Sequence, residues 1–296
     1  MKHRLFLTPL DENFIHSFGV GCVAYYLGEH FNVSPLECFI AGCLHDLGGA
    51  VPTQKRIDVA HDMGISLCKE EIQCPLLIHD KLGYYFSKYY FKIHNERINK
   101  AILYHTTCID NASNIEKIVF IADKLQWDRN GIPPYFEELK SKLSDSLNEG
   151  CAFFVNWLYN DPKIYVRHPF LKRSYQYFCE EADIENVPFV VENVRIEKNI
   201  IKNYYLQEIR ELFYSSFKDG LNAKKEYNMS LDFVAGTLTH LLDTVPDSKL
   251  NNIIRGFNAD LNVCKNKRYE AIVTILREEY HLNDQLLEKR IGMKMG

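Results

Sequence analysis

Several features that would assign a protein class at once are missing from this sequence. Its nine cysteines are scattered and include no CxxC pair, so neither a disulfide framework nor a thiolate zinc site is indicated. No run approaches the ~20 apolar residues of a membrane span, and residues 1–10 hold no apolar stretch of signal-peptide length. The formal net charge of −4 gives no broad basic field for nucleic acid. We therefore expect a cytoplasmic protein with reduced, mostly buried cysteines and neither a membrane nor a nucleic-acid partner.

The chain does contain enough apolar material for an ordinary globular core. Hydrophobic residues make up 46% and charged residues 25% of its 296 residues, so neither disorder nor a disulfide staple is required. This length suits one large domain or two ordinary ones. Apolar residues recur mainly with helical spacing, and the two strand-like runs are too few for a sheet. The sequence therefore predicts an all-α fold.

The first two helices are the best marked. Residues 11–30 carry apolar side chains on one face, which predicts a helix over that range. Ser34 is a candidate N-cap, Pro35 suits the first turn, and Glu37 completes a predicted capping box for a helix ending near Gly48-Gly49. Further helices are expected over 53–63, 80–91, 95–106, 134–148, 150–160 and 114–128, the last with a capping box of Ser113 and Glu116.

The helical pattern is interrupted around residues 183–198, where Pro188 opens an apolar run that suits a linker or a short extended segment. We therefore predict a helical bundle over residues 1–182, a linker over 183–198 and an α-helical C-terminal domain over 199–296. Helices in that last region are expected near 199–218, 230–243, 247–259 and 266–280. Their apolar stripes suit either a homodimer contact or docking on the bundle, and their role stays open. His240 and Asp243, three residues apart, suit a surface hydrogen bond better than a metal site.

The positions that carry chemistry are polar residues inside strongly apolar helical stretches: His16, the pair His45-Asp46, His79, His105 and Asp123. An unpaired carboxylate beside a core costs several kcal/mol, and a bound cation offsets that cost. Imidazole nitrogens and carboxylate oxygens suit divalent ions such as iron, manganese or zinc. A helical bundle can present such ligands inward from several helices. The pattern therefore indicates a metal site.

Each of these residues, taken alone, has an ordinary structural interpretation. A lone histidine on an apolar helix face is more often a core or capping residue than a ligand. Asp46 could cap a neighbouring helix, Asp123 could pair with Lys124 or Arg129, and His79 could simply begin a helix. Thr106 could be an ordinary helix-end hydroxyl. The order His, His-Asp, His, His, Asp between residues 16 and 123, always in an apolar setting, favours the metal site.

In five stretches the sequence resembles a known family. These are His16-Ser-Phe-Gly-Val, Ala41-Gly-Cys-Leu-His-Asp, Leu76-Leu-Ile-His-Asp-Lys-Leu-Gly, Ile102-Leu-Tyr-His-Thr-Thr and Glu116-Lys-Ile-Val-Phe-Ile-Ala-Asp-Lys-Leu, followed by Asp128-Arg129. Their order resembles the HD superfamily of metal-dependent phosphohydrolases. The His-Thr-Thr and Ala-Asp-Lys elements resemble its YqeK-type branch, described as symmetrical diadenosine tetraphosphate hydrolases. The resemblance covers roughly residues 10–175 and leaves out residues 185–296.

This resemblance implies a role for each matching residue. The implied metal ligands are His16, His45, Asp46 and Asp123. The residues implied to face the nucleotide are His79, His105, Thr106, Asp123 and Arg129. The implied catalytic residues are Asp46, His79 and His105. The chain departs from the family at Asn13, where a basic residue is common, at Gly48-Gly49-Ala50, where a lysine is common, and near Gln126, where a glutamate is usual.

The function that the resemblance implies is hydrolysis of nucleotide phosphoanhydride bonds, with symmetrical cleavage of diadenosine tetraphosphate to two ADP. The implied cofactor is a pair of divalent cations that activates a water, expected as a di-iron centre with manganese or another divalent ion as alternatives. The departures leave other readings open: an HD hydrolase of a nucleoside mono- or triphosphate or a cyclic dinucleotide, or a nucleotide-sensing domain without turnover. A purely structural helical scaffold is the remaining alternative.

Overall fold

The computed structural model describes residues 10–126, 132–180, 194–227 and 233–238, and the regular secondary structure among these residues is helical, with no strand. This confirms the all-α prediction. By its internal packing the chain divides into two compact units, one of residues 20–204 and one of residues 1–19 with 205–296. Helix α1 (Leu10–His30), at the position predicted, runs through this division. Within the described parts of the chain, none of the helices combines the length and the apolar character that crossing a membrane needs.

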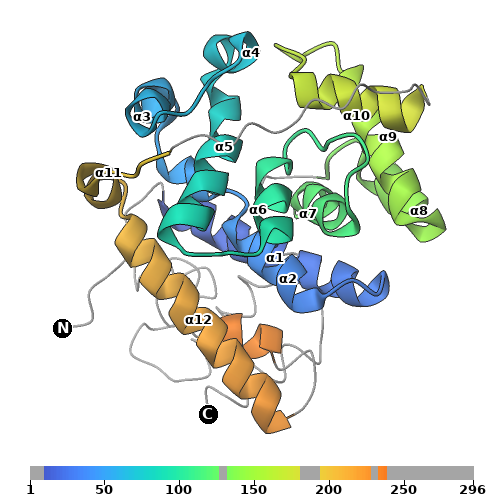
Figure 1. Cartoon of the computed structure of the whole chain (residues 1–296). Coiled ribbons are helices and arrows are strands. Elements are labelled where there is room, and N and C mark those ends of the chain that lie inside the picture. The colour runs from blue at the N-terminus through green and yellow to red at the C-terminus, as the bar shows by residue number, and fades with distance from the viewer. Residues whose placement is uncertain (1–9, 127–131, 181–193, 228–232, 239–296) are drawn as a thin grey trace, which may run out of the picture. The chain divides into compact units, whose positions relative to one another are not determined.

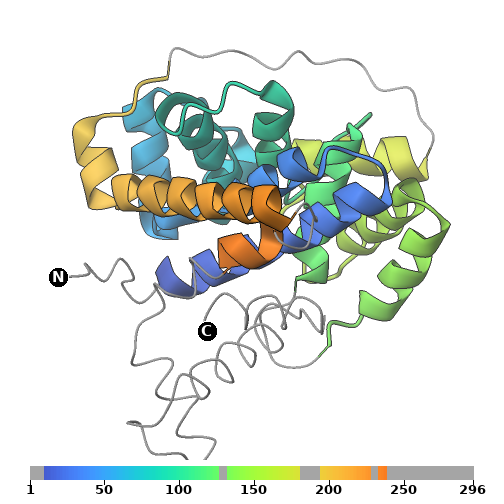
Figure 2. The ribbon, with the colours of Figure 1, turned by 90° about the horizontal axis from the view of Figure 1, so that it is seen from below.

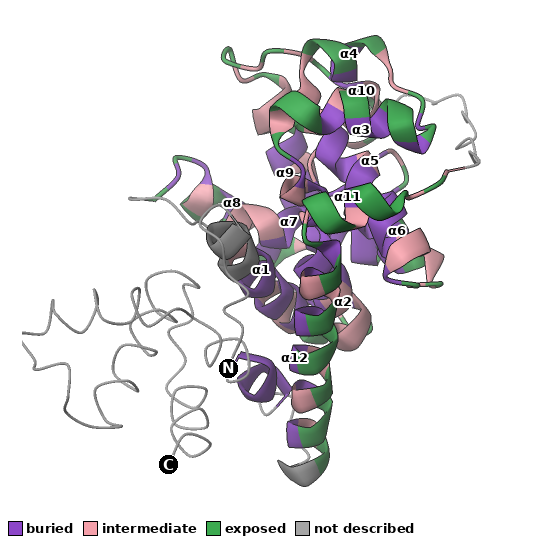
Figure 3. Ribbon diagram, turned by 90° about the vertical axis from the view of Figure 1, so that its left-hand side faces the viewer, coloured by how far each residue is buried: buried purple, intermediate pink, exposed green. Residues whose placement is uncertain are grey.

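The core of the larger unit is built by α2 (Pro35–Leu44), α6 (Glu96–Leu103) and α7 (Asn114–Leu125), which pack on one another as Figure 1 shows. Residues 115–122 of α7 are all buried, so this helix is enclosed around most of its circumference. The predicted capping box before α7 is confirmed, because the Ser113 backbone N–H donates to Glu116 Oε2 at 2.7 Å. Figure 3 shows α7 as the buried centre of the unit.

Helix α2 ends earlier than predicted and is capped differently. The predicted capping box of Ser34 and Glu37 is wrong, since the Ser34 side chain makes no capping hydrogen bond. The Glu37 carboxylate instead accepts from Asn95 Nδ2 at 2.7 Å and lies 3.2 Å from the Arg97 guanidinium. A charge-assisted tertiary contact therefore replaces the local cap. The chain then leaves the α-helix at Leu44 and continues as a short 3₁₀ turn, η1 (Leu47–Ala50).

A second group of helices covers α7. Helix α9 (Leu147–Tyr159) packs against α7 and between α8 (Phe136–Asp145) and α10 (Pro169–Cys179), a grouping visible in Figure 2. The predicted helices over 134–148 and 150–160 are thus confirmed with shifted ends, because Ser146 caps α9 by accepting from the Glu149 N–H. Fully buried Phe120 of α7 meets Phe154 of α9 edge-on, with ring centroids 5.6 Å apart.

The segment between α2 and α6 is a series of short turns around one buried helix. It comprises η2 (Thr53–Lys55), α3 (Arg56–Met63), α4 (Lys69–Gln73), η3 (Pro75–Leu77), α5 (Ile78–Tyr85) and the π-helical turn η4 (Phe86–Tyr90). Helix α5 packs on both η1 and α6. Tyr84, Tyr85 and Tyr104 are buried and help to fill this part of the core.

The predicted helix over 199–218 is divided in two. Helix α11 (Lys198–Asn203) ends just before Tyr205, whose φ of 53° lies in the left-handed region and interrupts the helix. Helix α12 (Leu206–Tyr227) follows and belongs to the smaller unit. There the rings of Phe217 and Phe233 meet edge-on, with centroids 5.7 Å apart. The predicted helices over 247–259 and 266–280, with His240, Asp243 and most of the predicted linker, lie outside the described residues.

Candidate metal centre

Three histidine rings converge where helices of the larger unit end or begin. His45 directly follows α2, His79 lies in the first turn of α5, and His105 follows α6 by two residues. In each case Nδ1 faces a backbone carbonyl three residues earlier. The Nδ1–O distances are 2.7 Å to Gly42, 2.6 Å to Leu76 and 2.8 Å to Ile102. A carbonyl can only accept, so Nδ1 carries a proton, and in the neutral form of each ring Nε2 presents a lone pair.

These lone pairs are close together and buried. The Nε2 atoms of His79 and His105 lie 3.1 Å apart, and the centroids of the His45 and His105 rings lie 4.7 Å apart. Burial holds the pKa of His105 well below its usual value, and the neighbouring His45 and His79 lower it further. Two facing lone pairs repel each other unless a cation lies beside them. Two ligand atoms each about 2.1 Å from one ion are separated by about 3 Å, so this spacing fits a metal.

Carboxylates complete the arrangement. Asp46 Oδ1 lies 3.5 Å from His79 Nε2, and Asp46 makes no capping hydrogen bond to the turn that follows it. Ligand atoms of Asp46, His79 and His105 all lie within 4.8 Å of one another. Asp123 Oδ1 lies 3.4 Å from His45 Nε2, while the other oxygen of Asp123 contacts the Lys124 ammonium. The donor set of imidazoles and carboxylates is the one that divalent cations prefer.

Asp80 is a further carboxylate at this centre that the sequence analysis did not single out. Its Oδ1 lies 3.0 Å from His79 Nε2 and 3.7 Å from His105 Nε2, and it accepts a hydrogen bond from Thr106 Oγ1 at 2.8 Å. Burial raises the pKa of Asp80, while the neighbouring His79 opposes that rise. The signal that could have found it is a second His-Asp pair, His79-Asp80, again beside an apolar run.

A close backbone contact sets Asp46 against His79. Gly48 in η1 packs so tightly on α5 that a Cβ built there would lie 2.1 Å from the His79 carbonyl oxygen. The buried guanidinium of Arg56 supports the same region, donating to the carbonyl of Val51 at 2.9 Å and of Leu76 at 2.7 Å. The Leu76 carbonyl is also the one that orients His79. Backbone packing and this arginine therefore fix the ring that faces Asp46.

The structure thus brings together His45 with Asp123, and Asp46 with His79, His105 and Thr106. His16 lies on α1 within residues 1–19, in the segment assigned to the smaller unit, and its place in the ligand set stays a prediction. Arg129 lies outside the described residues.

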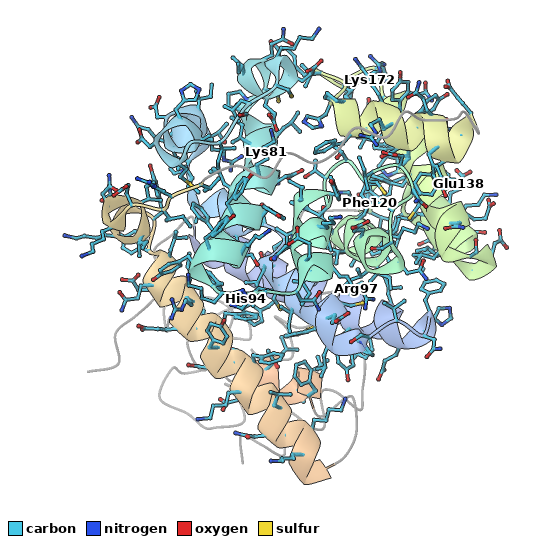
Figure 4. The ribbon with its side chains drawn as sticks, viewed as in Figure 1. Lys81, His94, Arg97, Phe120, Glu138 and Lys172 are labelled. Carbon is cyan, nitrogen blue, oxygen red and sulfur yellow. The ribbon has the colours of Figure 1, made fainter. Side chains whose placement is uncertain are left out.

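A second cluster in the larger unit has metal-ligand residue types but the wrong proton arrangement. Ligand atoms of Cys68, Glu71 and His168 lie within 4.8 Å of one another. His168 Nδ1 accepts from the Phe170 N–H at 3.2 Å, so its Nε2 carries the proton and points at Glu71 Oε1, 3.5 Å away. The Lys81 ammonium, labelled in Figure 4, already lies 2.9 Å from Glu71 Oε2. This cluster is a clamp that ties α4 and α5 to the start of α10.

Comparison with known proteins agrees with this fold and site. The model of the HD domain family matches residues 13–128. A Lactococcus lactis protein, named only as an uncharacterized protein in the pepC 5′ region, is 35% identical over 185 residues. That alignment spans 62% of this chain and 90% of the relative. The chain therefore belongs to the HD domain family and is an HD-type hydrolase.

Two further relatives bear nucleotide-related names. A Bacillus subtilis protein named bis(5′-nucleosyl)-tetraphosphatase, symmetrical, is 27% identical over 141 residues, which is 47% of this chain and 73% of that protein. A solved structure from Clostridium acetobutylicum, described as a predicted HD superfamily hydrolase involved in NAD metabolism, has a TM-score of 0.51 and 25% identity. It covers 57% of this chain and 89% of its own. These relatives fit the YqeK-type resemblance.

Proposed function

We propose that this protein hydrolyses a phosphoanhydride bond of a nucleotide with the help of two divalent cations, and that its substrate is diadenosine tetraphosphate, cleaved symmetrically to two ADP. One observation carries the metal part of the proposal. Three buried imidazoles are each fixed through Nδ1, so that their Nε2 lone pairs face carboxylates and one another. The name of the Bacillus subtilis relative supports the choice of nucleotide.

The geometry suggests a division of the ligands between two positions. We assign His45 and Asp123 to one cation, with His16 as the remaining imidazole from α1. We assign His79 and His105 to the other cation, with Asp46 beside them because its Oδ1 faces His79. Asp46 also directly follows His45, a ligand of the first cation, in the chain. The two residues that the resemblance placed against the nucleotide, His79 and His105, thereby become metal ligands in the proposal.

The residues of the chain have separate tasks in this scheme. When bound, divalent cations lower the pKa of a water and offset phosphate charge. The Nδ1 contacts hold the three imidazoles in the tautomer that can ligate, and the buried surroundings strengthen every charge interaction at the centre. The Thr106 hydroxyl donates its proton to Asp80 and therefore orients that carboxylate. Arg129 keeps its expected task of binding phosphate oxygens.

The substrate is tested by product analysis. Purified full-length protein, loaded with Mn²⁺ or Fe²⁺, is incubated with diadenosine tetraphosphate, ATP, AMP and a cyclic dinucleotide in parallel, and products are quantified by chromatography. We expect ADP as the sole product from diadenosine tetraphosphate and slower turnover of the others. Faster turnover of another nucleotide would assign a different substrate to the same centre. Tight nucleotide binding without any product would favour a sensing domain instead.

The metal part is tested by Asp46→Ala, our first prediction. Removing the carboxylate that faces His79 should lower hydrolysis at least about 100-fold, because the electrostatic term usually dominates phosphoryl transfer. Metal content, measured by elemental analysis, should fall with it, while circular dichroism keeps its helical signal. The matched control is Asp145→Ala, which removes an exposed carboxylate from the end of α8. Full activity of Asp46→Ala would show that the metal mechanism is wrong.

A further inference from the structure

We infer that Asp80 is an additional ligand of the cation held by His79 and His105, and that Thr106 positions its carboxylate for that task. This inference rests on the proposed metal function and deepens it. It gives the second position two imidazoles and two carboxylates, Asp46 and Asp80, in place of one carboxylate. Neither the five motifs nor the names of the relatives assign a role to Asp80.

The first argument is the geometry of the ligand atoms. Asp80 Oδ1 lies 3.0 Å from His79 Nε2 and 3.7 Å from His105 Nε2, and the two Nε2 atoms lie 3.1 Å apart. For comparison, Asp46 Oδ1 lies 3.5 Å from His79 Nε2, which is 0.5 Å farther than Asp80 Oδ1. Donors that each lie about 2.1 Å from one ion are about 3 to 3.5 Å apart, so two of the three Asp80 separations match a shared ion and the third exceeds that range slightly.

The second argument is the charge that Asp80 brings into the core. The residue is 6% exposed, and its Oδ1 faces the Nε2 atoms of His79 and His105. In both rings the Nδ1 proton points away to a carbonyl, so the neutral form of each ring presents its Nε2 lone pair to the carboxylate. A buried carboxylate facing two lone pairs is unfavourable by several kcal/mol without a cation. A divalent ion at this point removes all three repulsions together.

The third argument is the way that Thr106 holds the carboxylate. Its hydroxyl has one proton, and Oγ1 lies 2.8 Å from Asp80 Oδ1. The same oxygen lies 3.2 Å from His105 Nε2 and 3.4 Å from His79 Nε2, and neither nitrogen has a proton to give when its ring is neutral. The hydroxyl proton therefore goes to Asp80 and fixes the rotation of its carboxylate. Such supporting hydrogen bonds typically contribute 10- to 100-fold to metal affinity, so Thr106 is a positioning residue.

The consequence concerns metal preference. A second carboxylate adds a hard oxygen ligand and a negative charge, compared with a position built from imidazoles and a single carboxylate. Carboxylate-rich sites suit Mn²⁺, whereas imidazole suits zinc and copper as well. The second position should therefore retain Mn²⁺ well, and loss of Asp80 should weaken Mn²⁺ binding more than Zn²⁺ binding.

The test is a titration of the metal alone, without any nucleotide. Full-length protein is stripped with chelator, and Mn²⁺ binding is followed by electron paramagnetic resonance of the free ion. Wild-type protein should bind two ions. Asp80→Asn keeps the shape and the hydrogen bond from Thr106 but removes the charge, so we expect one ion to bind unchanged and the other at least about 10-fold more weakly. Thr106→Val should weaken the same ion by a smaller factor.

The outcomes separate the inference from the function that it rests on. If wild-type protein binds no Mn²⁺, the proposed metal function itself fails. If wild-type protein binds two ions and Asp80→Asn binds both within about twofold of the wild-type affinities, Asp80 is not a ligand. Asp145→Asn on α8 is the control for loss of an exposed carboxylate. Should Asp80→Asn fail to fold, Thr106→Val decides: weakening of one ion supports the inference, and two unchanged affinities overturn it.

Discussion

A buried imidazole must satisfy both of its nitrogens, and the way it does so decides what it can bind. His45, His79 and His105 donate from Nδ1 to a carbonyl, which leaves Nε2 able to ligate a cation. His168 has the reverse arrangement, because its Nδ1 accepts from the N–H of Phe170 at the start of α10. The same residue type therefore serves as a candidate metal ligand in three places and as a helix cap in a fourth.

The clamp around Glu71 predicts how stability depends on pH. Burial raises the pKa of this carboxyl, but the hydrogen bond from His168, the Lys81 ammonium and the Cys68 N–H outweigh burial and hold the pKa at about 2. A carboxyl with a depressed pKa stabilises the fold above its unfolded value of 4.5, and that contribution disappears as pH falls towards 2. By linkage the loss is at most about 3 kcal/mol.

The corresponding variant is Glu71→Gln. Urea unfolding at pH 6 and pH 3 should show that wild-type protein loses more of its free energy of unfolding on acidification than this variant does. The control is Glu138→Gln, which changes an exposed glutamate on α8 that Figure 4 labels. Equal pH dependence of wild type and Glu71→Gln would mean that the clamp contributes nothing to stability.

At the scale of secondary-structure elements, the backbone contact between η1 and α5 matters most for the candidate site. The turn η1 carries Asp46 at its start and meets α5 at Gly48, where the His79 carbonyl leaves no room for a Cβ. The family often has a lysine shortly after the His-Asp pair, and this chain has glycine there. The absence of a side chain lets the backbone carrying Asp46 approach the backbone carrying His79.

We therefore predict that Gly48→Ala is strongly unfavourable. The new methyl group must push η1 away from α5, which should lower the free energy of unfolding by about 1–3 kcal/mol. The displacement should also weaken metal binding, because Asp46 and His79 move apart. Chemical denaturation and Mn²⁺ titration measure the two effects. Gly49→Ala, in the same turn but partly exposed, is the control and should be close to wild type in both.

Helix α10 lies beyond residues 13–128, the part that matches the HD family, yet it supports the chain around His105. The Arg173 guanidinium binds Asp110 through two nitrogens, at 2.6 and 2.8 Å, and Ser174 Oγ donates to the Thr107 carbonyl. Between those anchors Cys108 has a φ of 56°, an unfavourable conformation for a non-glycine residue. The helix thus holds a strained loop that carries His105 and Thr106.

At the scale of the whole molecule, metal binding should be visible as stability. A ligand that binds the folded chain and not the unfolded one adds about 2.7 kcal/mol when present at 100 times its Kd. We predict that Mn²⁺ raises the Tm of chelator-stripped protein and that EDTA lowers it again, as measured by calorimetry. The shift should be largely lost in Asp46→Ala and retained in Asp145→Ala. A Tm that changes with neither Mn²⁺ nor EDTA would argue against a metal centre in the folded protein.

The sequence alone determined the helical class, the positions of most helices in the larger unit and the polar residues worth testing. These follow from apolar periodicity and from short-range capping, such as the box before α7, which act over a few residues. Tertiary structure alone decided how those residues combine. Packing between distant segments brings Glu37 to Asn95 and Arg97, pairs His168 with Glu71 and places Asp80 against two histidines. Pairings of this kind depend on long-range packing and loop closure, which local spacing does not encode.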